Sequence, residues 1–186
     1  MYKLISTADV FQKDSFIDTV IKNRGIENKE RFLNPSADDL IHYSKLVNID
    51  KAVEVFKKHI QKENPKIAII VDSDPDGFCS SAILGNYIEK YFHYAENLYY
   101  LFHKGKQHGI TNDKLNEIKK IHKEYGIDLL IIPDAGTNDI EHHKIIKEEL
   151  GIDIIIVDHH IAEGEESPHA IIVNNQISPE YHNKQL

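Results

Sequence analysis

The chain has 186 residues and a formal net charge of −8, which excludes a strongly basic protein that coats nucleic acid. Its 41% hydrophobic and 28% charged residues are typical of one globular domain with a small attachment. A single cysteine excludes a disulfide framework and a zinc–thiolate cluster. Residues 1–14 lack the apolar core of a signal peptide, and no apolar run approaches the ~18 residues of a membrane span. We therefore expect a cytoplasmic protein without a membrane partner.

Residues 1–63 are expected to form a helical N-terminal segment that packs on the rest of the chain. Apolar residues recur at helical spacing over residues 17–21 and again over residues 52–60. Asp50 is placed to cap the start of the second helix, and the run KENPK at residues 62–66 ends it.

From residue 64 to residue 186 the pattern changes to short apolar runs that alternate with amphipathic stretches. The runs predict strands at residues 67–71, 98–102, 129–132, 154–157 and 170–173, and the stretches predict helices at residues 80–92, 112–125 and 139–150. Strands that are apolar throughout are buried on both faces, and alternation with helices indicates right-handed crossovers between parallel strands. We therefore expect an α/β domain with an open, doubly wound, mainly parallel sheet of about five strands.

Acidic and imidazole side chains follow three of the predicted strands. The stretch DSDPDG places Asp72, Asp74 and Asp76 after the first strand. Asp134 follows the third strand, and the run DHH at residues 158–160 follows the fourth. In an open parallel sheet, ligands bind at the carboxyl ends of the strands. We expect these side chains to converge there, and a cation to offset the repulsion between their carboxylates.

Carboxylate oxygens combined with imidazole nitrogens suit a transition metal such as Mn²⁺ better than Ca²⁺ or thiolate-type zinc. A cluster this acidic can hold two ions that share one carboxylate. Two ions ~3.5–4 Å apart are the apparatus that hydrolyses phosphate esters. The sequence therefore predicts a metal-dependent phosphoesterase.

An EF-hand is a competing interpretation of the first acidic motif. Asp72, Asp74, Asp76 and Gly77 match the first, third, fifth and sixth positions of its calcium loop. The twelfth position should be Glu but is Ile83, and the loop follows a strand instead of a helix. Both features argue against an EF-hand.

Five further residues are candidates for contacts with a substrate phosphate. Residues 100–125 hold six lysines against three acids, a local charge of +3 that is compatible with a nucleic-acid track. A solvated lysine-rich face explains this charge equally well. Ser80 and Ser81 are expected in the first turn of a helix, where backbone amides bind phosphate, or they are plain helical residues. The candidates are Lys104, His108, Gly109, Ser80 and Ser81. His142 and His143 are expected at the surface.

The three motifs, DSDPDG at residues 72–77, DAG at residues 134–136 and DHH at residues 158–160, resemble those of the DHH phosphoesterase superfamily. The likeness is strongest to the RecJ-type exonucleases that are specific for single-stranded DNA. The flanking runs NRGI at residues 23–26 and RFLNP at residues 31–35 are also similar to that family. The resemblance covers essentially the whole chain.

This resemblance implies hydrolysis of single-stranded DNA in the 5′-to-3′ direction, with two Mn²⁺ ions, or Mg²⁺, as cofactors and roles in DNA repair and recombination. Asp74 would bind one ion, Asp76 the other, and Asp134 both. His159 would complete the second site, and His160 would contact the scissile phosphate or orient a ligand. The implied catalytic residues are Asp74, Asp76, Asp134, His159 and His160, with Asp72 and Asp158 as further metal ligands.

The chain departs from the family pattern in three ways. Ile70 stands where some members have a metal-binding His, Ala135 stands where RecJ-like proteins often have Cys, and only Gly109 remains of a Gly-Tyr-Gly-like turn. The family also continues with a fourth motif, which carries another metal-binding Asp, and with a second domain. A C-terminal half or a partner chain is therefore expected to complete the site.

Two other functions remain open from the sequence. The chain could be a catalytically weak adaptor that binds nucleic acid or protein and retains the metal cradle. It could also be a phosphodiesterase for oligoribonucleotides or cyclic dinucleotides. Turnover of long single strands compared with dinucleotides separates the second alternative from the exonuclease.

Overall fold

The computed structural model describes residues 13–93 and 95–181, and the chain divides into two compact units, Met1–Ile41 and His42–Leu186. The domain boundary predicted between residues 63 and 64 stays a prediction. Helix α3 (Ile49–Ile60), which lies in the predicted N-terminal segment, packs against two strands of the second unit, β4 and β5.

The first unit holds the helices α1 (Lys13–Asn23) and α2 (Lys29–Leu33) and the 3-10 turn η1 (Ala37–Asp39). The side chain of Asn28 starts α2 by accepting a hydrogen bond from the amide of Arg31. Ser36 and Asp39 form a capping box around η1. These caps satisfy backbone amides that short helices leave without partners.

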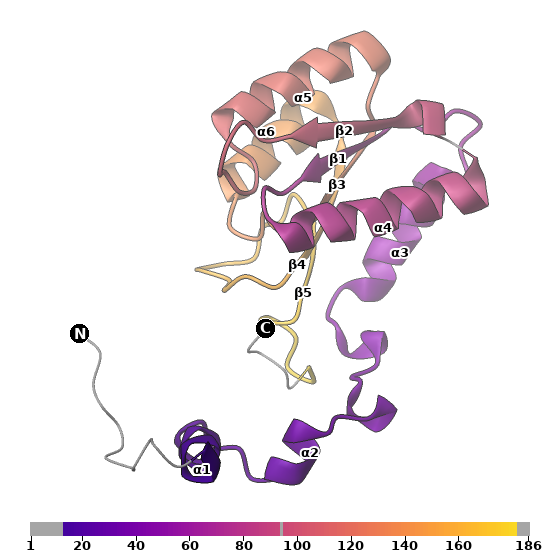
Figure 1. Cartoon of the computed structure of the whole chain (residues 1–186). Helices are drawn as coiled ribbons and strands as arrows, with labels where there is room; N and C mark the ends of the chain where they lie inside the picture. The colour runs from indigo at the N-terminus through magenta and orange to yellow at the C-terminus, as the bar shows by residue number, and fades with distance from the viewer. Residues whose placement is uncertain (1–12, 94, 182–186) are drawn as a thin grey trace. The chain divides into compact units, whose positions relative to one another are not determined.

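The second unit is built on one five-stranded sheet in the order β2-β1-β3-β4-β5, in which every neighbouring pair is parallel (Figure 1). The α/β fold class predicted from the sequence is confirmed. The strands are β1 (Ile67–Val71), β2 (Leu98–Phe102), β3 (Leu129–Pro133), β4 (Asp153–Asp158) and β5 (Ile171–Asn174). β1 and β3 are buried along their whole length, because apolar side chains on both faces meet helices.

Helices cover both faces of the sheet, and each face has its own apolar core. Helices α5 (Asn112–Tyr125) and α6 (Ile140–Leu150) contribute to the core that contains Ile70 of β1. Helices α3 and α4 (Pro75–Phe92) contribute to the core that contains Ile69. Consecutive strand residues therefore point to opposite cores, as a doubly wound sheet requires. The 3-10 turns η2 (Tyr43–Lys45) and η3 (Ala95–Asn97) complete this unit.

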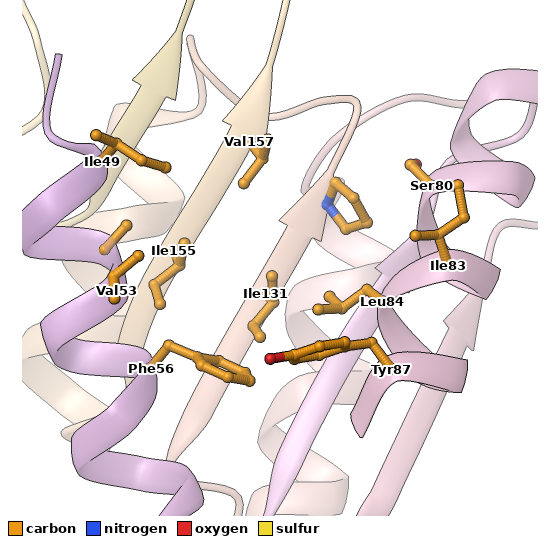
Figure 2. A pocket seen from close by; sticks show the side chains of 12 residues that line it. Ile49, Val53, Phe56, Ser80, Ile83, Leu84, Tyr87, Ile131, Ile155 and Val157 are labelled. Atoms are coloured by element: carbon orange, nitrogen blue, oxygen red, sulfur yellow. The ribbon is translucent and has the colours of Figure 1, made fainter. Parts of the chain in front are cut away.

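An apolar groove of about 460 Å³ lies between α3 and α4, over strands β3 and β4 (Figure 2). Its floor is formed by strand residues and its walls by side chains of the two helices. Ile83 of α4 is 70% exposed and Val157 of β4 is 46% exposed along it. The lining includes Val53, Phe56, Ile83, Leu84, Tyr87, Ile131, Ile155 and Val157. Among the described residues, no helix is long and apolar enough to cross a membrane.

Two helices begin at other residues than the sequence indicates. Helix α4 begins at Pro75 and not at Ser80, because Asp74 caps it and Pro75 occupies its first turn, where a missing amide hydrogen has no cost. Helix α3 begins after Asn48, so Asp50 lies in its first turn and is not its cap. The Asn48 side chain instead donates hydrogen bonds to the carbonyl of Ile172 and to Glu166.

Candidate metal centre

The carboxyl ends of β1, β3 and β4 bring the predicted acidic residues to one edge of the sheet. These three strands are neighbours in the sheet order, so the residues that follow them lie side by side. Asp72 follows β1, Asp134 follows β3, and Asp158 ends β4. Asp74 and Asp76 reach the same edge from the cap and the first turn of α4.

One cluster consists of Asp76, Asp134 and His159, whose ligand atoms lie within 4.8 Å of one another. His159 Nε2 lies 3.0 Å from Asp134 Oδ1 and 3.7 Å from Asp76 Oδ2. These two carboxylates and one imidazole form the donor set that suits Mn²⁺.

Asp134 is the most perturbed carboxyl of this edge. Its side chain is 7% exposed, and its backbone adopts a positive φ of 81°. Burial, together with the charges of Asp76 and Asp74, raises the pKa of Asp134 to about 6. Asp134 Oδ2 is buried without a hydrogen-bond partner among the described residues. A buried, unpartnered carboxylate oxygen among other carboxylates fits a cation, so the residues present fit a metal site.

A second cluster consists of Asp72, Asp74 and His108, whose ligand atoms also lie within 4.8 Å of one another. His108 Nδ1 lies 2.6 Å from Asp72 Oδ2. The amide of Gly77 donates to Asp74 Oδ1 at 3.1 Å, and this bond holds the pKa of Asp74 below its ordinary value. His108 was expected to contact substrate, and the structure places it against a carboxylate of the first motif.

Two glycines allow the backbone to close around Asp72 and its neighbours. A Cβ added at Gly77 would lie 2.5 Å from the Cβ of Asp72, so α4 can begin this close to β1 only with glycine there. Gly109 has φ of 63°, donates its amide to Asp72 Oδ1 at 3.3 Å, and would meet Asp139 if it carried a Cβ. Both glycines therefore shape the site through the backbone.

Asp158 binds hydrogen-bond donors with both of its oxygens. Oδ2 accepts from the amide and the hydroxyl of Thr137 at 3.0 and 2.6 Å. Oδ1 accepts from the amides of His159 and His160 and lies 2.8 Å from His160 Nδ1. Burial raises the pKa of Asp158, but the bonds from Thr137 and His160 outweigh it and hold the pKa below its ordinary value. Asp158 thus fixes the backbone at His159 and His160 and orients the imidazole of His160.

His160 faces a hollow of about 260 Å³ next to the two clusters. Its ring centroid lies 4.7 Å from that of His159 and 6.3 Å from that of His108. The hydrogen bond to Asp158 raises the pKa of His160, which favours a cationic ring. The hollow is lined by His108, Gly109, Ala135, Gly136, Thr137, Asn138, Asp139, Asp158 and His160.

The remaining predicted substrate residues do not gather in this hollow. Lys104 is exposed in the loop after β2 and lines a separate hollow. Ser80 and Ser81 lie in the second turn of α4, so the prediction that they occupy the first turn is wrong. The hydroxyl of Ser80 donates to the carbonyl of Gly77, and Ser81 is buried.

Several residues that support the site were not identified from the sequence as site residues. The Asn174 amide, at the end of β5, donates to Thr137 Oγ1 and to the carbonyl of His160, both at 2.9 Å. Gln176 donates to the carbonyl of His159 at 3.2 Å. The rule that strand ends face the site would have identified Asn174, whereas no sequence signal indicates Thr137 or Gln176.

Comparisons with known proteins match one family model and several proteins named as exonucleases. The model of the DHH family, N-terminal domain, matches residues 66–182. A Bacillus subtilis protein named putative SPbeta prophage-derived single-strand DNA-specific exonuclease YorK is 44% identical over 185 residues, which are 100% of this chain and 30% of that protein. The single-stranded-DNA-specific exonuclease RecJ of Bacillus subtilis is 27% identical over 162 residues, covering 85% of this chain and 20% of that protein. RecJ of Haemophilus influenzae is 25% identical over 163 residues, covering 87% of this chain and 27% of its own length. The chain thus spans 30% or less of the length of these relatives.

Proposed function

The chain belongs to the DHH family, and we propose that it hydrolyses phosphodiester bonds of single-stranded DNA with bound divalent metal ions. The names of the relatives, single-strand DNA-specific exonucleases, support this substrate. Exonucleolytic cleavage in the 5′-to-3′ direction is part of the proposal.

The environment of Asp134 is the observation that carries the metal part of this proposal. Its carboxylate is buried beside His159, and Oδ2 has no hydrogen-bond partner among the described residues. Such a group costs free energy unless an opposite charge compensates it. A divalent ion held by Asp134 together with Asp74 and Asp76 would supply that charge.

We propose that Asp76, His159 and Asp134 hold one ion, while Asp74 and Asp134 hold another with Asp72 as an accessory ligand. The imidazole ligand favours Mn²⁺, and the carboxylates also accommodate Mg²⁺. Bound ions of this kind lower the pKa of water and neutralise charge on phosphoryl oxygens.

The chain's own residues would then orient the scissile phosphate. Asp158 holds His160 through Nδ1, so Nε2 is the atom of His160 that can donate to a phosphate oxygen. Lys104, His108 and Gly109 are proposed to contact phosphates of the strand. A region that the longer relatives carry beyond the matched residues, or a partner chain, is proposed to complete the site.

A nuclease assay tests the proposal with a single-stranded oligonucleotide labelled at its 5′ end. We expect labelled mononucleotides in Mn²⁺, none in EDTA, and none with Asp134→Asn. Asp50→Asn, which changes an exposed carboxylate of α3, is the matched control and retains cleavage. Cleavage that persists in EDTA or in Asp134→Asn contradicts the metal centre. No cleavage in Mn²⁺ or Mg²⁺ by the folded chain, either alone or joined to the remaining region of a longer relative, contradicts the proposed hydrolysis.

A further inference from the structure

We propose that three aromatic residues beside the metal centre, Phe78, Tyr100 and Phe102, form a platform on which the bases of the single strand stack. This inference rests on the proposed single-stranded substrate and adds where its bases bind. We call these three residues the aromatic platform.

The rings of the aromatic platform form a continuous row. Tyr100 and Phe102 are two residues apart on β2, so their side chains leave the same face of the sheet. Their ring centroids lie 6.4 Å apart with an interplanar angle of 28°. Phe78, on the first turn of α4, stacks on Phe102 at 6.0 Å and 29°. Each of these two ring pairs is thus tilted by less than 30°, within the stacked geometry that a base can continue.

The aromatic platform is unusually exposed for such large apolar side chains. Phe78 is 51%, Phe102 52% and Tyr100 40% exposed. They border a hollow of about 280 Å³ together with Val71 of β1 and Ser81, Ala82 and Asn86 of α4. Adjacent exposed aromatic side chains indicate a binding surface more strongly than scattered ones do.

The aromatic platform begins directly at the metal centre. Phe78 is two residues beyond Asp76, in the same turn of α4. Phe102 pairs across the sheet with Val71, the residue that precedes Asp72. A nucleotide held with its phosphate at the carboxylates therefore has its neighbouring bases within the reach of these rings.

Positively charged side chains beside the aromatic platform suit the phosphate of a nucleotide. Phe102 also lines a hollow of about 400 Å³, which includes Lys104, Lys114 and Lys120 together with Asp113 and Glu117 and so has a net charge of +1. Neither Lys104 nor Lys120 forms an ion pair with a described residue, whereas Glu117 is bound by Lys114. Phe102 thus separates an apolar hollow suited to bases from a lysine-bearing hollow suited to phosphates, the combination that single-strand binding proteins use.

Packing of edge strand β2 on α4 is the structural role that these rings could serve instead. The Tyr100 hydroxyl occupies space left by Gly85, where an added Cβ would lie 1.8 Å from it. A purely structural role predicts that ring removal lowers stability. It does not predict any effect that depends on the bases of the DNA.

The test measures binding by fluorescence anisotropy, with Ca²⁺ replacing Mn²⁺ and strand integrity checked on a gel. The probes are a short oligothymidylate and an abasic strand of the same length and charge. The ring-removing variant is Phe78→Leu/Phe102→Leu, and Phe78→Tyr/Phe102→Tyr restores the rings. Tyr125→Leu is the matched control, because Tyr125 is 44% exposed and its ring contacts that of Tyr99, away from the carboxyl end of β2.

We expect the unmodified chain to bind oligothymidylate at least about fivefold more tightly than the abasic strand, since each stacked base contributes that much or more. The Leu variant loses this preference, and the Tyr variant and Tyr125→Leu keep it. Thermal melting checks folding, and if the double Leu variant does not fold, Phe78→Leu alone must lower the preference.

A preference that survives ring removal, or equal binding of the two strands by the unmodified chain, overturns the aromatic platform. Equal binding together with Mn²⁺-dependent cleavage leaves the proposed function intact. Binding of neither strand, without cleavage, overturns both proposals.

Discussion

Replacing His143 with leucine is expected to remove a loss of stability that acid causes in the unmodified chain. His143 lies on α6 with no exposed surface, and its two ring nitrogens have no hydrogen-bond partner among the described residues. Burial lowers the pKa of His143 to about 4, from the 6.5 expected when the chain is unfolded.

The sign and size of the effect follow from this difference. Below pH 6.5 the unfolded chain binds a proton at His143 while the folded chain does not, so acid favours unfolding. The free energy of unfolding falls through this window until the folded histidine also titrates near pH 4. A difference of roughly 2.5 pKa units corresponds to a loss of about 3 kcal/mol.

Urea unfolding followed by circular dichroism, in EDTA and at a series of pH values, measures this loss. We expect the free energy of unfolding of His143→Leu to exceed that of the unmodified chain by about 3 kcal/mol more at pH 4 than at pH 7.5. If the free energy of unfolding of His143→Leu differed from that of the unmodified chain by the same amount at both pH values, the reasoning would be refuted.

Three further outcomes are expected from the same structure. Burial raises the pKa of Asp153, but hydrogen bonds from Lys147 and two other donors outweigh burial and hold this pKa below its ordinary value. Asp153→Asn should therefore lower the free energy of unfolding in urea by about 1–3 kcal/mol at pH 7, and this loss should shrink below pH 4. Equal losses of unfolding free energy at both pH values would contradict this expectation. Gly77→Ala should weaken Mn²⁺ binding at least about tenfold in calorimetry, because its Cβ would meet Asp72, and unchanged affinity would refute that contact. The apolar groove should enhance the fluorescence of the dye ANS, and Ile83→Glu should reduce it; dye binding unaffected by this change would place the exposed apolar surface elsewhere.

The strands could be predicted because each is a short apolar run that can be buried only inside the sheet. Ile67–Val71 lies buried on both faces, and its predicted and observed bounds agree. The same logic predicts where functional residues meet, since neighbouring parallel strands end at one edge. Asp134 and His159 are therefore brought to 3.0 Å although 25 positions separate them in the sequence.

What the sequence leaves out are contacts that depend on how loops and helices approach each other. His143 was expected at the surface because its neighbours in the sequence are polar, yet α6 turns it into the core. The 2.6 Å contact between His108 and Asp72 spans 36 positions and depends on the loop after β2. Thr137 is an ordinary loop residue in sequence, and its role emerges only from its bonds to Asp158.

Calorimetric titration of the chain with Mn²⁺ tests the central claim most directly, because it measures the metal centre apart from any substrate. We expect binding of two ions per chain, loss of both in Asp134→Asn, loss of one in His159→Gln, and unchanged binding in Asp50→Asn. Absence of Mn²⁺ binding by the folded chain, or binding that Asp134→Asn leaves intact, would contradict a metal centre at the carboxyl ends of β1, β3 and β4.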